Sequence, residues 1–258
     1  MMRRCLLAPV LIIPALIAFA PAAHAADEEI QVYMDELTAP GHLGLDLHVN
    51  DVLSGARGAD YPGGEASLHR LRVTPELSVG LSKTWDIGFY LPLTTLASDG
   101  KYRVQGAKLR IKWLAPHKAE GFYGGANFEI GRVAHRLDEN PWNAEMKLIG
   151  GWRRGPWEVG LNGNFDFVVS GPAPTPATFD LSSRIGYRVA PKLVLGVENY
   201  TGFGPLKSLG HFGRNEQASF VTADTSLGKW DVHLGLGKTY GTSTDNVIAK
   251  LIIGVPMP

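Results

Sequence analysis

Residues 71–93 read LRVTPELSVGLSKTWDIGFYLPL. Apolar and polar side chains alternate from Leu71 to Leu81, and the alternation resumes from Trp85 to Leu93 after a short turn. Successive side chains on a β-strand point to opposite faces of the sheet, so each run has one apolar and one polar face. Similar alternation recurs to the end of the chain. The stretch therefore predicts two neighbouring strands of an all-β protein.

The first 25 residues are typical of a secretory signal peptide. Arg3 and Arg4 give a charged start, residues 6–20 form an apolar core, and Ala23-His24-Ala25 is a cleavage signal. A membrane anchor is the alternative. The core contains two prolines and is shorter than the roughly 20 residues that a spanning helix needs. We therefore expect cleavage after residue 25 and export from the cytoplasm.

Cleavage would remove Cys5, the single cysteine. The mature chain is then predicted to have no disulfide, thiolate metal site or cysteine nucleophile.

The mature chain would carry a net charge of −2, with 23 basic against 25 acidic residues. This charge gives no basis for a nucleic-acid partner. A mean hydropathy of −0.03 fits a barrel whose strands are half polar as well as it fits a soluble protein.

An exported chain of alternating strands predicts a transmembrane β-barrel in the outer membrane of a Gram-negative bacterium, apolar outside and polar inside. Short and long connections alternate along the chain, as periplasmic turns and outer loops do in such barrels. A soluble sandwich is the rival fold. The sequence predicts an antiparallel up-and-down barrel of about twelve strands, at about 43–53, 69–82, 85–95, 102–114, 121–133, 143–153, 157–169, 178–189, 192–201, 216–228, 230–239 and 246–255.

Aromatic residues gather beside the short connections of the predicted barrel. Aromatic side chains favour the interface between lipid and water, where the ring is buried and the polar atom stays wet. A sandwich core has no reason to collect its tryptophans at one end of its hairpins. Trp142, at the end of a long loop, is the exception. The predicted girdle at the short-turn end contains Trp85, Trp113, Phe122, Trp152, Trp157, Tyr187 and Trp230.

The charged side chains fall on the opposite parity and are predicted to line the lumen. Two interpretations remain open: a polar conduit for small solutes, or charges that pair across strands and fill the interior. Charges of both signs argue against strong ion selectivity. The predicted lining contains Arg72, Glu76, Asp86, Lys108, Arg110, Lys112, Glu129, Glu145, Lys147, Arg153, Glu158, Asp166, Asp180, Arg184, Arg188, Glu198, Asp224, Asp231 and Lys250.

The residues before the first strand do not alternate cleanly. We divide the chain into a signal peptide (1–25), an amino-terminal periplasmic or plug segment (26–42) and the barrel (43–258). Residues 27–40 are rich in Asp and Glu, which would suit the basic side chains of the lumen wall. The sequence does not decide whether this segment extends into the periplasm or folds into the barrel as a plug.

Some outer-membrane barrels hydrolyse lipids with a Ser-His pair and an orienting Asn or Asp. Ser208 and His211, with Asn215 nearby, are the candidates here. No nucleophile-elbow motif is present, and no group of His, Asp and Glu has the spacing of metal ligands. We therefore expect no catalytic residue, no metal site and no cofactor, with a lipid-modifying enzyme as the alternative.

Three stretches carry a resemblance: EIQVYMDELTAPGHLGLDLHVNDV at Glu29–Val52, LRVTPELSVGL at Leu71–Leu81, and GKWDVHLGLGK at Gly228–Lys238. They are similar to a family of Gram-negative barrel proteins, the putative outer-membrane proteins of the phenol-degradation "MetA-pathway" type. The resemblance implies movement of small, often apolar or aromatic compounds, and no catalytic residues. The chain departs from barrels that end in an aromatic residue, because it ends Val255-Pro256-Met257-Pro258.

The sequence thus predicts a porin-like passive pore or uptake channel for small molecules, apolar or aromatic compounds included. Its expected partners are outer-membrane lipid, the barrel-assembly machinery and the solute. A structural or interaction barrel with a closed lumen is the third possibility.

Overall fold

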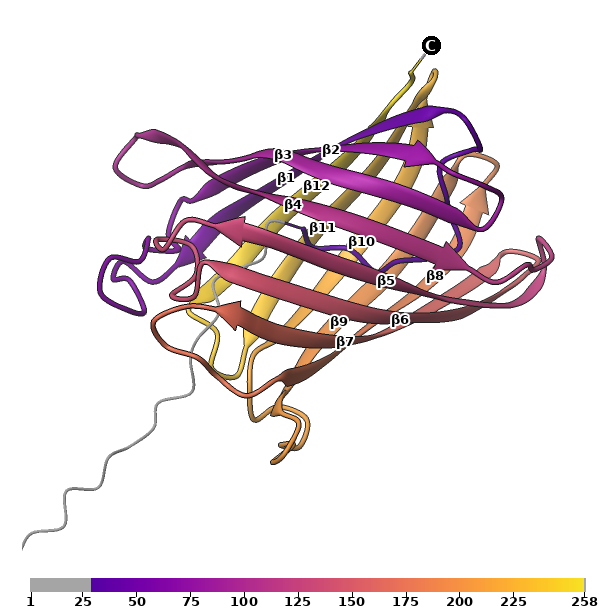
Figure 1. Cartoon of the computed structure of the whole chain (residues 1–258). Helices are drawn as coiled ribbons and strands as arrows, with labels where there is room; N and C mark the ends of the chain where they lie inside the picture. Colours follow the sequence, from indigo (N-terminus) through magenta and orange to yellow (C-terminus); the bar gives the residue numbers. More distant parts are fainter. Residues whose placement is uncertain (1–28, 258) are drawn as a thin grey trace, which may run out of the picture.

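The computed structural model describes residues 29–257, and within them twelve antiparallel strands form one closed barrel (Figure 1). The predicted signal peptide lies outside the described residues. No described helix is long and apolar enough to cross a membrane. In chain order the strands are β1 (Leu43–Gly55), β2 (Leu71–Gly80), β3 (Trp85–Leu96), β4 (Tyr102–Leu114), β5 (Gly121–Val133), β6 (Trp142–Arg154), β7 (Trp157–Ser170), β8 (Thr178–Ala190), β9 (Leu193–Pro205), β10 (Gln217–Leu227), β11 (Trp230–Tyr240) and β12 (Asp245–Val255).

Each strand pairs with its neighbours along the chain, and β1 closes the barrel by pairing with β12 from Leu45↔Val255 to Gly55↔Asp245. The predicted all-β, twelve-stranded, up-and-down architecture is confirmed. The boundaries differ by a few residues. For example, β9 continues to Pro205 because its end still pairs with Thr178 of β8.

The connections are shorter on average at one end of the barrel than at the other. At one end the connections after β2, β4, β6, β8 and β10 have 4, 6, 2, 2 and 2 residues, and at the other end those after β1, β3, β5, β7, β9 and β11 have 15, 5, 8, 7, 11 and 4 residues. Antiparallel neighbours put these two sets at opposite ends. The start of β1 and the end of β12 lie at the short-turn end, which is the periplasmic end in barrels of this type. The last strand is paired as far as Val255.

Polarity is inverted relative to a soluble protein. Among the described residues, thirty buried side chains are polar or charged and sixteen are hydrophobic. Large apolar side chains, in contrast, lie exposed on the outer surface: Leu148 of β6 is 49% exposed and Val221 of β10 is 64% exposed. Such a surface is stable in the hydrocarbon of a bilayer, where apolar side chains face lipid tails.

The aromatic residues of the predicted girdle lie at the short-turn end. Trp85 pairs with Trp113 across β3 and β4, and their ring centroids are 6.3 Å apart. Trp157 and Tyr187 make an edge-to-face contact at 4.7 Å between β7 and β8. Phe122 is 83% exposed. These positions support the interpretation that the aromatic residues form a girdle at the membrane interface.

Residues 29–40, here called the inner segment, lie inside the barrel (Figure 1). Val32, Tyr33 and Met34 are buried against inward-facing Leu114, Tyr123 and Ile149 of the wall. Ile30 packs in a second cluster with β-strand side chains on the other side of the lumen. The segment has no strand structure, apart from an isolated bridge between Pro40 and Gly80.

Candidate functional site

The lumen wall contains most of the charged residues that the alternation assigned to it. Two predicted members, Arg188 and Asp231, are instead exposed, because they lie one to three residues from the short turns at the end of the barrel. The remaining members are buried or half-buried on the inward parity: Arg72, Glu76, Asp86, Lys108, Arg110, Lys112, Glu129, Glu145, Lys147, Arg153, Glu158, Asp166, Asp180, Arg184, Glu198, Asp224 and Lys250.

On one side of the lumen, Arg110 of β4 joins two carboxylates. Its guanidinium lies 2.6 Å from Glu76 of β2 and 2.8 Å from Asp86 of β3. His48 of β1 contacts the other oxygen of Glu76 at 3.2 Å. Four neighbouring strands are therefore linked across their inner faces by charge-assisted contacts, which are stronger than neutral hydrogen bonds.

On the opposite side, Arg184 of β8 is the centre of a second network. It contacts Glu158 of β7 at 3.2 Å, Glu198 of β9 at 2.7 Å, and Asp224 of β10. Lys250 of β12 also pairs with Glu198. These pairs satisfy charges that would otherwise be buried at great cost.

The inner segment binds to this wall through polar contacts at its backbone. Asn162 of β7 accepts a hydrogen bond from the Tyr33 amide at 2.6 Å and donates one to the Tyr33 carbonyl at 2.9 Å. Lys112 donates to the Glu36 carbonyl at 2.9 Å, and Lys250 donates to the Ile30 carbonyl at 3.0 Å. Wall side chains thus satisfy backbone groups that a strand neighbour would pair with in a sheet.

The acidic side chains of the segment also meet basic partners. Arg153 of β6 lies 2.6 Å from Asp35 and 2.6 Å from Glu36. The ammonium groups of Lys147 and Lys112 lie 4.0 and 4.6 Å from the centre of the Tyr33 ring, within the range of a cation–π contact.

Sequence reasoning did not identify Tyr33, Asn162 or Gly160 as part of this region. A Cβ at Gly160 of β7 would lie 2.3 Å from the Met34 sulfur, so this glycine leaves room for the segment. A Cβ at Gly80 would lie 2.1 Å from the Ala39 carbonyl. A glycine on the inward parity of a strand is the only local signal of such a close approach.

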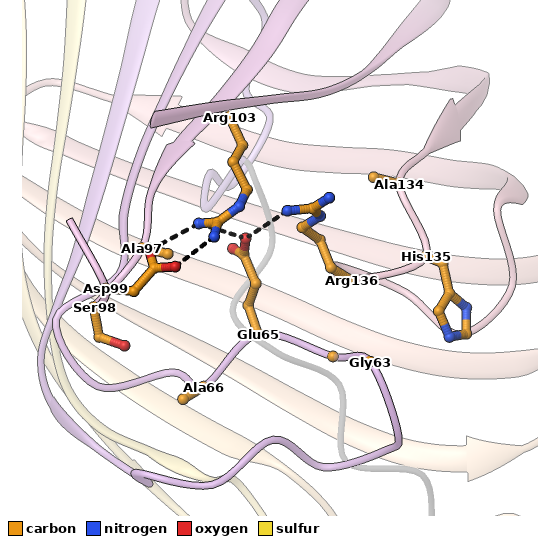
Figure 2. A pocket seen from close by; sticks show the side chains of 11 residues that line it. Gly63, Glu65, Ala66, Ala97, Ser98, Asp99, Arg103, Ala134, His135 and Arg136 are labelled. Atoms are coloured by element: carbon orange, nitrogen blue, oxygen red, sulfur yellow. Dashed lines mark hydrogen bonds and ion pairs between the residues drawn. The ribbon is translucent and has the colours of Figure 1, made fainter. Parts of the chain in front are cut away.

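At the loop end, a cavity of about 430 Å³ lies among the loops that follow β1, β3 and β5. Figure 2 shows Glu65 between Arg103 and Arg136, with Asp99 on the far side of Arg103. The Arg103 side-chain hydrogen bond lowers the pKa of Asp99 to about 2. His135 lies apart from these charges and contacts two backbone carbonyl oxygens at 3.1 Å each. The cavity is a polar vestibule whose charges are largely paired with one another.

The enzyme alternative rested on the loop after β9. Ser208 and His211 are both exposed there, and no hydrogen bond joins them in the part of the chain that the structure describes. The His211 ring contacts the Phe212 carbonyl, and Asn215 is half-buried. These three residues do not form a catalytic arrangement in this conformation.

One group of potential metal ligands does come together. Glu29, His48 and Glu76 each offer one ligand atom, and these atoms lie within 4.8 Å of one another. The three residues come from the inner segment, β1 and β2, so no sequence spacing could have revealed them.

No protein-family model matches the sequence. No curated protein matches it either. Among solved structures, a NanC porin is similar at a TM-score of 0.53 and 8% identity, covering 83% of this chain and 99% of the porin. LpxR from Salmonella typhimurium (TM-score 0.42, 13% identity, 83% and 100% coverage) and outer membrane phospholipase A from Escherichia coli (0.45, 10%, 82% and 90%) also align.

The NanC porin likeness concerns the fold alone, and it agrees with the closed barrel and its apolar exterior. Together these features define the class: the chain is a twelve-stranded, porin-like transmembrane β-barrel of the outer-membrane type. Membership of the "MetA-pathway" type stays a prediction from the resemblance.

Proposed function

We propose that this protein is a solute channel of the outer membrane and that the inner segment closes it. The observation that carries the proposal is the way in which residues 29–38 are held. They lie in the lumen, yet they pair with no strand, and side chains of the wall hold them at backbone atoms. Such a segment can leave the lumen without breaking a barrel hydrogen bond, and the wall beneath it carries the charges of a polar conduit.

The solute class is small molecules that pass a polar, mixed-charge wall. Acidic and basic residues alternate along the wall and pair between nearby strands, so strong selection of one ion sign is not expected. The resemblance to the "MetA-pathway" type implies apolar or aromatic compounds, so uptake assays should include both a small sugar and a phenol. Insertion by the barrel-assembly machinery belongs to the same proposal.

The test weakens the contacts between the inner segment and the wall and leaves the backbone hydrogen bonds between the strands intact. Asn162→Ala removes both hydrogen bonds to the Tyr33 backbone. Two hydrogen bonds of about 1 kcal/mol each should shift the balance from closed to open by about tenfold or more. The measurement is open probability in planar-bilayer recordings of the purified mature chain.

Asn164→Ala is the matched control. Asn164 lies two residues further along β7, is also buried and inward-facing, and bonds to Ser182 at 3.0 Å rather than to the segment. We expect Asn162→Ala to open more often than the wild type and Asn164→Ala to match it. No conductance from any of the three proteins, together with no solute uptake, would favour a structural barrel with a permanently closed lumen.

A further inference from the structure

Glu29, His48 and Glu76 meet where the inner segment reaches the inner faces of β1 and β2. We propose that these residues form a binding site for a divalent transition-metal ion of the Zn²⁺ class, which joins the inner segment to the barrel wall. Imidazole nitrogen and carboxylate oxygen are ligands that Zn²⁺ takes in proteins.

One potential ligand atom at this site lacks any partner. Oε1 of Glu29 is buried without a hydrogen bond. Buried polar atoms are nearly always satisfied in folded proteins, so an unpaired atom requires an explanation. A bound cation would supply the missing interaction at this carboxylate oxygen, and it would bind His48 through Nε2, the nitrogen that faces Glu76.

The other oxygen of each carboxylate is already held in place. Oε2 of Glu29 accepts a hydrogen bond from the Tyr90 hydroxyl at 2.7 Å, and Oε1 of Glu76 accepts one from Arg110 at 2.6 Å. Partners of this kind orient the ligands of metal sites. Oε2 of Glu76 and Nε2 of His48 are 3.2 Å apart. Two ligands of a tetrahedral Zn²⁺ ion lie about 3.3 Å apart, given bonds of about 2.0 Å.

The His48–Glu76 contact could also be a simple ion pair within the wall. An ion pair would use only these two residues and would leave Oε1 of Glu29 without a partner. The metal site accounts for all three residues, and its ligand from the inner segment lies 19 and 47 positions before the other two. The ion would hold the segment inside the lumen, a consequence that rests on the proposed channel function, whereas the binding itself does not.

Binding is tested on the purified mature barrel in detergent, stripped with EDTA and titrated with Zn²⁺ against a chromophoric chelator. We expect one tight equivalent in the wild type, and an affinity lower by about tenfold or more in Glu29→Gln and His48→Gln. Glu29 lies outside the strands, so Glu29→Gln tests the site without altering the barrel. A heat-modifiable band confirms the fold of each variant.

His42→Gln is the control, because His42 is exposed in the turn before β1 and lies outside the cluster. It should bind Zn²⁺ as the wild type does. Equal affinity in wild type and Glu29→Gln, or no tight equivalent in the wild type, overturns the site.

The binding readout is independent of conductance, so the two proposals can fail separately. A barrel that binds one Zn²⁺ but never conducts supports the metal site and refutes the channel. A barrel that conducts but binds no Zn²⁺ refutes the metal site and leaves the channel standing.

Discussion

Arg184 illustrates how single residues stabilise the interior of this barrel. Its guanidinium contacts three carboxylates from three different strands, and its side chain is only 4% exposed. Charged groups at such a position are tolerated only when they are paired and hydrogen-bonded. The inward parity of Arg184 could be predicted from the alternation, but its partners could not, because Glu158 and Asp224 lie far from it in the sequence.

We predict that Arg184→Met destabilises the barrel by about 1.5–3 kcal/mol, since it removes the cation shared by three carboxylates. A second basic partner stays beside each of them: Arg153 beside Glu158, Lys250 beside Glu198 and His233 beside Asp224. Arg188→Met on the same strand removes an exposed arginine and should change stability by no more than about 0.5 kcal/mol. Urea unfolding in lipid vesicles, followed by tryptophan fluorescence, gives both values. Equal midpoints for the two variants would contradict the role assigned to Arg184.

In β4 the local alternation predicts where the strand lies but not how it pairs with its neighbours. The alternation located this strand at 102–114, matching Tyr102–Leu114, because strand periodicity is a property of neighbouring residues. It did not reveal the irregular pairing around Gly106, where the register between β3 and β4 shifts. Gly106 has a φ of +146°, and a Cβ there would lie 2.0 Å from the Arg132 carbonyl of β5. Only glycine suits this close approach.

Gly106→Ala is therefore expected to weaken the pairing of β4 with β5 and to cost about 1–3 kcal/mol. Gly150→Ala in β6 is the control, because the nearest atom, the Leu161 carbonyl oxygen, would be 4.0 Å from the new Cβ and the φ of Gly150 is ordinary. The fraction of protein that keeps the fast-migrating, unboiled band on a gel, measured over a temperature series, reports the difference. A lower transition temperature for Gly150→Ala than for Gly106→Ala would refute this reasoning.

For the whole molecule, the sequence could predict a barrel with a charged interior but could not decide what fills it. Contacts between the inner segment and the wall join residues that are far apart, such as Tyr33 and Asn162, 129 positions apart. No local pattern encodes such a contact. The acidic composition of residues 27–40 did indicate basic partners, and Arg153 is one of them; residues 27 and 28 lie outside the described part of the chain.

We propose that residues 29–38 close a lumen that is otherwise able to conduct. The most direct measurement compares planar-bilayer conductance of the complete mature chain with that of a chain lacking residues 29–38, after a heat-modifiable band has shown that both are folded. We predict rare, small openings for the complete chain and larger, long-lived conductance steps for the shortened one. Identical conductance in the two proteins would show that residues 29–38 do not close the lumen.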